Sequence, residues 1–150
     1  MVGIDLRQQL QNYIESMHEQ GILDHNFHNV QDLQNEENPH FVLEVVTMFC
    51  NDAENGIAQL ARYLDELVVD YPKVTGLSHQ LRGSSSSVGG HRMALACREL
   101  RRASDVNNKE GCFEALGRVR HEYRILRDNL NNISQMERSI ITNAARGGQQ

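Results

Sequence analysis

Residues 41–67 read FVLEVVTMFCNDAENGIAQLARYLDEL, and the apolar side chains in this stretch recur every three or four positions. The recurring positions are Val42, Val46, Phe49, Ala53, Ile57, Leu60, Leu64 and Leu67. This near-heptad spacing places them on one stripe of a long α-helix that ends before Asp70. Asn38 and Pro39, a capping residue followed by a proline, predict where the helix begins. The stretch therefore predicts a long helix that needs partners to cover its apolar stripe.

The same spacing continues toward the N-terminus. It predicts a first helix over about 4–20, which Gly21 ends in a left-handed conformation. A short second helix follows, capped by Asp24, and the polar run 35–38 then interrupts the pattern. The inward positions expected in these two helices are Leu6, Leu10, Tyr13, Ile14, Met17, Phe27, Val30 and Leu33.

Toward the C-terminus the pattern predicts three further helices. Asp70 and Pro72 begin the fourth helix, and the pair Gly89-Gly90 closes it. The fifth runs over about 91–104, and the polar stretch 105–110 turns the chain into a long sixth helix. The inward positions expected there are Phe113, Leu116, Val119, Tyr123, Leu126, Leu130, Ile133 and Met136.

These helices define an all-α fold class. No stretch combines sustained alternation with β-branched enrichment, which is the signature of strands. Short connections make the last four helices antiparallel neighbours, so we expect a four-helix up-down bundle with two additional N-terminal helices, six in total. One domain over 1–143 and a disordered tail over 144–150 are the expected organisation.

Composition narrows the class of function. The chain has 150 residues, 39% of them hydrophobic, and a formal net charge of -5. A nucleic-acid binder needs a basic surface, so we expect protein partners and no nucleic acid. The apolar runs are too short to cross a bilayer, and residues 1–13 do not look like a secretory signal, so an intracellular protein without membrane contact is expected. Cys50, Cys97 and Cys112 contain no CxxC pair and are expected to be reduced thiols.

One segment does not behave like core. Residues 79–90 read HQLRGSSSSVGG, and their serines and glycine weaken a helix. At about 100° per residue, a buried stripe of Val74, Leu77, Leu81 and Val88 lies opposite His79, which therefore points outward. The same exposed face collects Thr75, Gly76, Arg82, Gly83, Ser86 and Ser87.

This face has a coherent chemical use. A neutral imidazole is a nucleophile near neutral pH, so His79 could accept a phosphoryl group. Arg82, one turn along, could neutralise the transferring oxygens, and glycines at 76 and 83 leave room for a partner's acidic pocket. Ser86 and Ser87 could donate hydrogen bonds. No base or metal ligand lies beside His79 in sequence, so the other half of the reaction must come from a partner.

Other interpretations of these residues stay open at this point. An exposed histidine on a helix is often only a polar residue, and the His, Arg and Ser spacing alone does not decide the matter. His25 and His28 are three residues apart, but no further ligand lies at metal-site spacing. An independent catalyst is disfavoured because neither His79 nor the serines have an orienting partner nearby in sequence. A helical adaptor that binds partners without carrying phosphate remains the main alternative.

The motif 79–90 resembles HQLKGSSSSIGA, the signature of plant-type histidine-containing phosphotransfer proteins. The runs 24–34 and 38–50 and the spacing of the last two helices are similar to the family too, so the resemblance covers nearly the whole chain. It implies a six-helix phosphorelay intermediate whose histidine takes phosphate from the receiver-domain aspartate of a hybrid sensor histidine kinase and hands it to a response-regulator aspartate.

By the resemblance, His79 is the phosphorylated residue, Arg82 neutralises charge and Gly83 gives clearance. The residues expected to bind the partner are Thr75, Gly76, Gln80, Ser86 and Ser87. The resemblance also implies a monomer that is a carrier and not an enzyme, with no cofactor of its own. Magnesium would be held by the receiver partner, and the setting would be cytokinin signalling in cytoplasm and nucleus.

The sequence departs from the family pattern at a few positions. Arg82 replaces the usual lysine, which keeps the charge but changes its geometry. Thr75 stands where an aspartate is common, and Leu77 and Ser78 replace an aromatic and an aliphatic residue. These changes bear on partner choice and transfer rate. Some family members lose the histidine and become inhibitors, whereas this chain keeps it.

Overall fold

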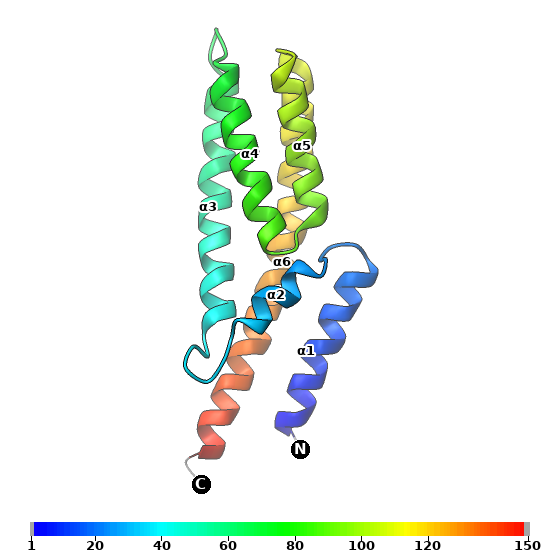
Figure 1. Ribbon diagram of the computed structural model, residues 1–150, viewed down its shortest axis with the longest axis vertical. Helices are drawn as coiled ribbons and strands as arrows, with labels where there is room; N and C mark the ends of the chain where they lie inside the picture. Colours follow the sequence, from blue (N-terminus) through cyan, green and yellow to red (C-terminus); the bar gives the residue numbers. More distant parts are fainter. Residues whose placement is uncertain (1, 149–150) are drawn as a thin grey trace.

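The structure is a computed structural model that describes residues 2–148, and it is built from six α-helices (Figure 1). In chain order they are α1 (Val2–Glu19), α2 (Asn26–Asp32), α3 (Phe41–Leu64), α4 (Tyr71–Ser87), α5 (His91–Asp105) and α6 (Lys109–Gly148). The all-α class and the number of helices predicted from the sequence are confirmed.

The four long helices α3 to α6 form an up-down bundle in which each helix runs antiparallel to the next (Figure 1). α3 packs on α4 and α6, and α5 packs on the same two helices, so α4 and α6 lie on opposite corners. α1 lies against the C-terminal part of α6, and the short α2 crosses near the lower end of α4 (Figure 1). The predicted bundle with two N-terminal helices is therefore confirmed.

A single hydrophobic core runs through the molecule and draws side chains from every helix. Its fully buried members include Ile14, Phe27, Leu60, Leu100 and Leu130. Burying one side chain of this size contributes about 1.5–3 kcal/mol. The core thus explains how helices with several weak helix formers, α4 above all, remain helical.

Both ends of α4 follow from the sequence. Asp70 is the N-cap, its carboxylate accepts a hydrogen bond from the Lys73 N–H at 3.4 Å, and Pro72 occupies the first turn. At the other end Gly89 has φ +79°, in the left-handed region that favours glycine. Its carbonyl accepts a hydrogen bond from the Asp24 N–H at 2.8 Å, which ties the end of α4 to the segment before α2. The predicted start and end of this helix are confirmed.

Some expected boundaries and inward positions are wrong. α3 begins at Phe41, because the Asn35 side chain accepts hydrogen bonds from the N–H groups of Glu37 and Asn38 and holds a turn there instead of a helix start. Leu67 is fully exposed because α3 ends at Leu64, and Leu33 is exposed because α2 ends at Asp32. In both cases the apolar spacing continues in the sequence past the last helical turn, but the helix itself has ended.

The start of α6 shows a related difference. Phe113 is 45% exposed, whereas its neighbour Cys112 is fully buried. The inward stripe of α6 begins at Cys112 and continues through Leu116 and Val119, all of which are buried. Phe113 lies about 100° around the helix from Cys112 and therefore falls beside this stripe.

The predicted tail over 144–150 is also corrected in part. α6 continues through Gly148, so residues 144–148 are helical. Ala144, Ala145 and Arg146 are strong helix formers and nothing before Gly147 interrupts them. The last two residues of that prediction lie outside the described part of the chain. No helix within residues 2–148 has the combination of length and apolarity that crossing a membrane requires.

Candidate functional site

His79 lies on α4 with its side chain exposed to solvent, as the helical rotation predicts. Val74, Leu81 and Val88 are buried on the opposite side. Leu77 is only partly buried and packs at the margin of the core. The outward direction of the imidazole is thus fixed by the packing of α4 against α3 and α5.

Two serines of α4 occupy buried positions next to its apolar stripe. Ser78 and Ser85 are both completely buried. Each hydroxyl donates to the carbonyl four residues earlier, Ser78 to Val74 and Ser85 to Leu81, both at 2.7 Å. This local bond satisfies a buried hydroxyl without any outside partner. Although serine weakens an isolated helix, Ser78 and Ser85 therefore provide small core positions whose hydroxyls are hydrogen-bonded within α4.

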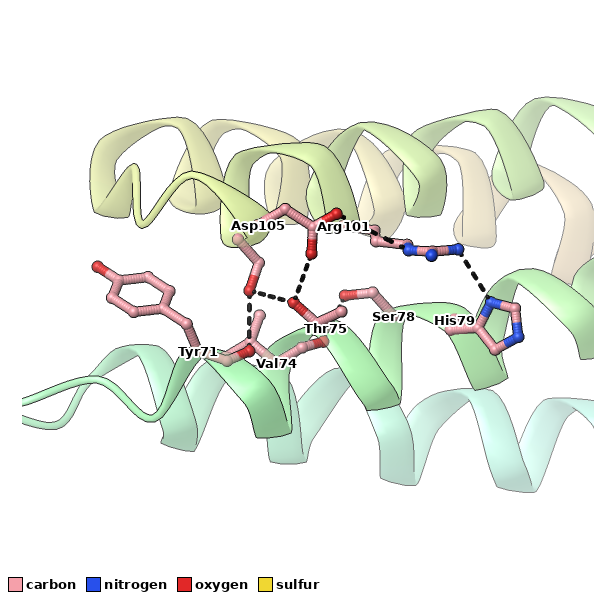
Figure 2. A network of polar contacts seen from close by, with 8 residues as sticks. Tyr71, Val74, Thr75, Ser78, His79, Arg101 and Asp105 are labelled. Carbon is pink, nitrogen blue, oxygen red and sulfur yellow. Dashed lines mark hydrogen bonds and ion pairs between the residues drawn. The ribbon is translucent and has the colours of Figure 1, made fainter.

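The imidazole of His79 has a partner that the sequence interpretation missed. Arg101, on α5, brings Nη1 to 3.3 Å from His79 Nδ1 (Figure 2). The other ring nitrogen points away from the guanidinium (Figure 2). In the sequence Arg101 is one of several charged residues in the segment 98–105, and its approach to His79 depends on the register of α5 against α4. Spacing along one helix holds no signal for that register.

A polar network continues behind Arg101 toward the start of α4 (Figure 2). Arg101 Nε lies 4.0 Å from Asp105 Oδ2, and Asp105 Oδ1 lies 3.1 Å from the Thr75 hydroxyl. That hydroxyl is 2.8 Å from Ser104 Oγ, which in turn is 3.0 Å from the Tyr71 carbonyl. Two hydroxyls carry two protons for three contacts, so one contact lacks a proton at any moment. Thr75 is thus engaged within the chain between α4 and α5.

Two glycines flank His79 on the exposed face. Gly76 and Gly83 are both exposed, and a Cβ added at either position would meet no atom within 4 Å. Neither glycine is required by the packing of this chain. The open surface on both sides of the imidazole is therefore available to another molecule.

The other residues predicted for the site are Arg82, Gln80, Ser86 and Ser87, and their surroundings differ. Arg82 is partly buried, and within residues 2–148 its guanidinium makes no hydrogen bond or ion pair. Gln80 is exposed and lines a groove between α3 and α4. Ser87 donates its hydroxyl to the Gly83 carbonyl at 3.0 Å, and the Ser86 carbonyl accepts from Asn26 Nδ2, also at 3.0 Å. The Ser87 hydroxyl and the Ser86 carbonyl thus make hydrogen bonds within the protein at the C-terminal end of α4.

The histidines considered for a metal site lie elsewhere. The His28 ring stacks on His18 with centroids 4.7 Å apart, and His25 is exposed. In the described part of the chain, no three His, Cys, Asp or Glu side chains come together as a metal site requires. The stacked pair is explained by packing between α1 and α2.

The bundle presents the imidazole of His79 on an open face of α4 between two exposed glycines. Comparison with known proteins identifies its family. A family model described as the Hpt domain matches residues 44–135, which include the whole of α4 and α5. The chain therefore belongs to the Hpt domain family of histidine-containing phosphotransfer proteins, as its motif predicts.

Relatives that match nearly the whole chain are also histidine-containing phosphotransfer proteins. Histidine-containing phosphotransfer protein 2 from Oryza sativa subsp. japonica is 39% identical over 141 residues, covering 93% of this chain and 95% of the relative. The X-ray structure of a histidine-containing phosphotransfer protein from rice superposes with a TM-score of 0.87 at 38% identity, covering 93% of this chain and 99% of that one. A crystal structure from maize gives a TM-score of 0.84 at 41% identity, covering 90% and 99%.

Proposed function

We propose that this chain is a phosphorelay intermediate that accepts a phosphoryl group on His79 from the receiver-domain aspartate of a sensor kinase and passes it to a response-regulator aspartate. Membership of the family supports the reaction class. The observation that carries the assignment to His79 is its exposed imidazole between two glycines that the chain's own packing does not need.

The reaction is a displacement at phosphorus. An imidazole nitrogen forms the N–P bond with its lone pair, the P–O bond to the donor aspartate breaks, and the electron pair leaves on the aspartate carboxylate. The second transfer reverses these events on another aspartate. This chain supplies the nucleophile and the guanidinium of Arg82, and the receiver supplies the divalent cation and the acidic pocket. The chain is accordingly a carrier and not an enzyme.

The bare face of α4 suits the approach of such a pocket. With hydrogen as their side chains, Gly76 and Gly83 let a receiver's loops come close to the ring. Gln80 is exposed beside this surface, at the groove between α3 and α4, and Ser86 and Ser87 mark its C-terminal end. Thr75 contributes through its link to Asp105 at the other end of the surface. Together these positions form the proposed docking surface around the phosphoacceptor.

The test is transfer of radioactive phosphate from a phosphorylated receiver domain to the chain. We expect an acid-labile, alkali-stable label on the wild type and none on His79→Gln, with both proteins showing the same helical circular dichroism. A label that persists in His79→Gln would assign the acceptor to another residue. An unlabelled wild type that still binds the receiver would select the phosphate-independent adaptor.

The biological setting is part of the same proposal. The plant sources of the relatives support cytokinin signalling, with a monomeric chain moving between cytoplasm and nucleus. Sedimentation of the purified chain and imaging of a fluorescent fusion in plant cells test these two points. A stable dimer, or a fusion excluded from nuclei, would contradict them.

A further inference from the structure

The contact between Arg101 and His79 fixes where the imidazole proton lies. An arginine side chain remains charged and carries only donors. In the 3.3 Å contact with Arg101 Nη1, His79 Nδ1 must therefore be the acceptor and must hold a lone pair. A neutral imidazole has one proton and one lone pair, so the proton of His79 is on Nε2.

The position of this proton decides whether the outward nitrogen, Nε2, can act as a nucleophile. Nδ1 faces the guanidinium on α5, and Nε2 is the nitrogen that points away from it (Figure 2). An approaching phosphoryl group meets Nε2 first, yet a protonated Nε2 has no lone pair with which to form an N–P bond. The nitrogen that does hold a lone pair is covered by Arg101.

We propose that Arg101 is a positioning residue that holds resting His79 with Nε2 outward and protonated, and that it must leave Nδ1 before Nε2 can react. The consequence for transfer rests on the proposed function. Nε2 loses its proton to water and Nδ1 takes one from water, with no net change. The Nε2 lone pair then forms the N–P bond while the donor's P–O bond breaks onto its carboxylate oxygen. The phosphorylated ring keeps the proton on Nδ1.

Asp105 gives the released guanidinium a second partner. Once Nδ1 is protonated, it and Arg101 are two donors facing each other, and the contact is lost. Arg101 Nε already lies 4.0 Å from Asp105 Oδ2, and the other carboxylate oxygen lies 3.1 Å from the Thr75 hydroxyl. Side-chain exposures of 40% and 50% leave both groups room to move. The guanidinium can therefore turn from the ring to the carboxylate without leaving α5.

Nitrogen-15 NMR of the unphosphorylated chain, labelled at histidine, tests the proposal. Long-range proton–nitrogen couplings at pH 8 give the ratio of the two neutral tautomers. We expect His79 in the wild type to favour the Nε2–H form more strongly than a histidine peptide in the same buffer. In Arg101→Met the ratio should fall to that of the peptide, a several-fold rise in the Nδ1–H form.

Arg82→Met is the matched control. It removes a guanidinium one turn from His79 that makes no contact with the ring, so the tautomer ratio should stay at the wild-type value. A wild-type ratio equal to that of the peptide would overturn the proposal, as would equal shifts in both variants. Because no phosphoryl donor is present, such a result would leave transfer to His79 unaffected and separately testable.

Discussion

Gly83 on α4 and Gly89 just beyond it are glycines for different physical reasons. At Gly89 the backbone needs φ +79°, and an added Cβ would lie 2.9 Å from the Phe27 backbone nitrogen. At Gly83 the backbone is helical and an added Cβ would meet nothing within 4 Å. At Gly89 the backbone conformation and the close packing both favour glycine. At Gly83 glycine makes the free chain less stable, and the proposed docking of a receiver gives it a use there.

The Gly83→Ala variant should separate stability from function. Alanine in an open helical position stabilises by about 0.5–1 kcal/mol relative to glycine, so the midpoint of urea unfolding should rise. The added methyl group stands on the face that a receiver must approach. We therefore expect the second-order rate of phosphoryl transfer from a receiver to fall by about tenfold, which corresponds to roughly 1.4 kcal/mol in the transition state.

Gly117→Ala is the control for this comparison. Gly117 is also an exposed helical glycine with open space at Cβ, but it lies on α6, which occupies the corner opposite α4. The variant should gain similar stability and transfer phosphate at the wild-type rate. Equal transfer rates in both variants would remove the clearance role of Gly83.

The residues of the site were predictable to different degrees for a physical reason. The outward direction of His79 follows from rotation along one helix, which a single segment of sequence determines. Arg101 lies 22 positions later on another helix, and its contact with the ring depends on how α5 slides against α4. Thr75 was placed on the partner surface, yet its hydroxyl faces Asp105 and Ser104 for the same reason.

At the scale of the element, α4 shows which local signals decide a helix. The N-cap at Asp70 and the left-handed Gly89 could be predicted because each depends only on residues close to it in sequence. The burial of Ser78 and Ser85 was not, because hydrophobic periodicity assigns buried positions to apolar residues. Their bonds to carbonyls of the preceding turn make a hydroxyl acceptable in the core, and Leu77 is left at its margin.

Replacing Gly89 should weaken the end of this element. In Gly89→Ala the left-handed backbone costs about 1–2 kcal/mol, and the methyl group would press on the backbone of the segment that leads into α2. We expect a loss of about 2–3 kcal/mol in the free energy of urea unfolding. Hydrogen exchange should increase most at the amides around Asp24 and Phe27. A stability equal to wild type would show that this connection can shift without loss.

At the scale of the whole molecule, the fold was predictable because six amphipathic segments with short connections leave few ways to bury their stripes. What remained unpredictable was where a periodic pattern stops being helix. Leu67 continues the stripe of α3 in sequence but is fully exposed beyond its last turn. Residues 144–146 carry no apolar stripe, yet they extend α6 because Ala144, Ala145 and Arg146 have high helix propensity.

The buried thiols make the stability of the bundle depend on alkaline pH. Burial raises the pKa of the Cys97 thiol to about 12, a shift that its contact with the Ser85 hydroxyl partly opposes. Burial also raises the pKa values of Cys50 and Cys112. Thiols in an unfolded chain ionise near pH 8.5. Above that pH the unfolded state binds fewer protons than the folded state, so stability falls as pH rises toward the folded pKa.

We expect the free energy of unfolding to fall measurably between pH 8 and pH 9.5, with Cys97 alone accounting for about 1 kcal/mol. Urea titrations at the two pH values measure the fall. Burial also raises the pKa of Tyr123, and the window ends at pH 9.5 because ionisation of an unfolded tyrosine, near pH 10, would add to the fall. Cys97→Ala should be less stable at both pH values, because it leaves a cavity, but its fall should be about 1 kcal/mol smaller. An identical fall in both proteins would mean that the Cys97 thiolate is accommodated in the folded bundle.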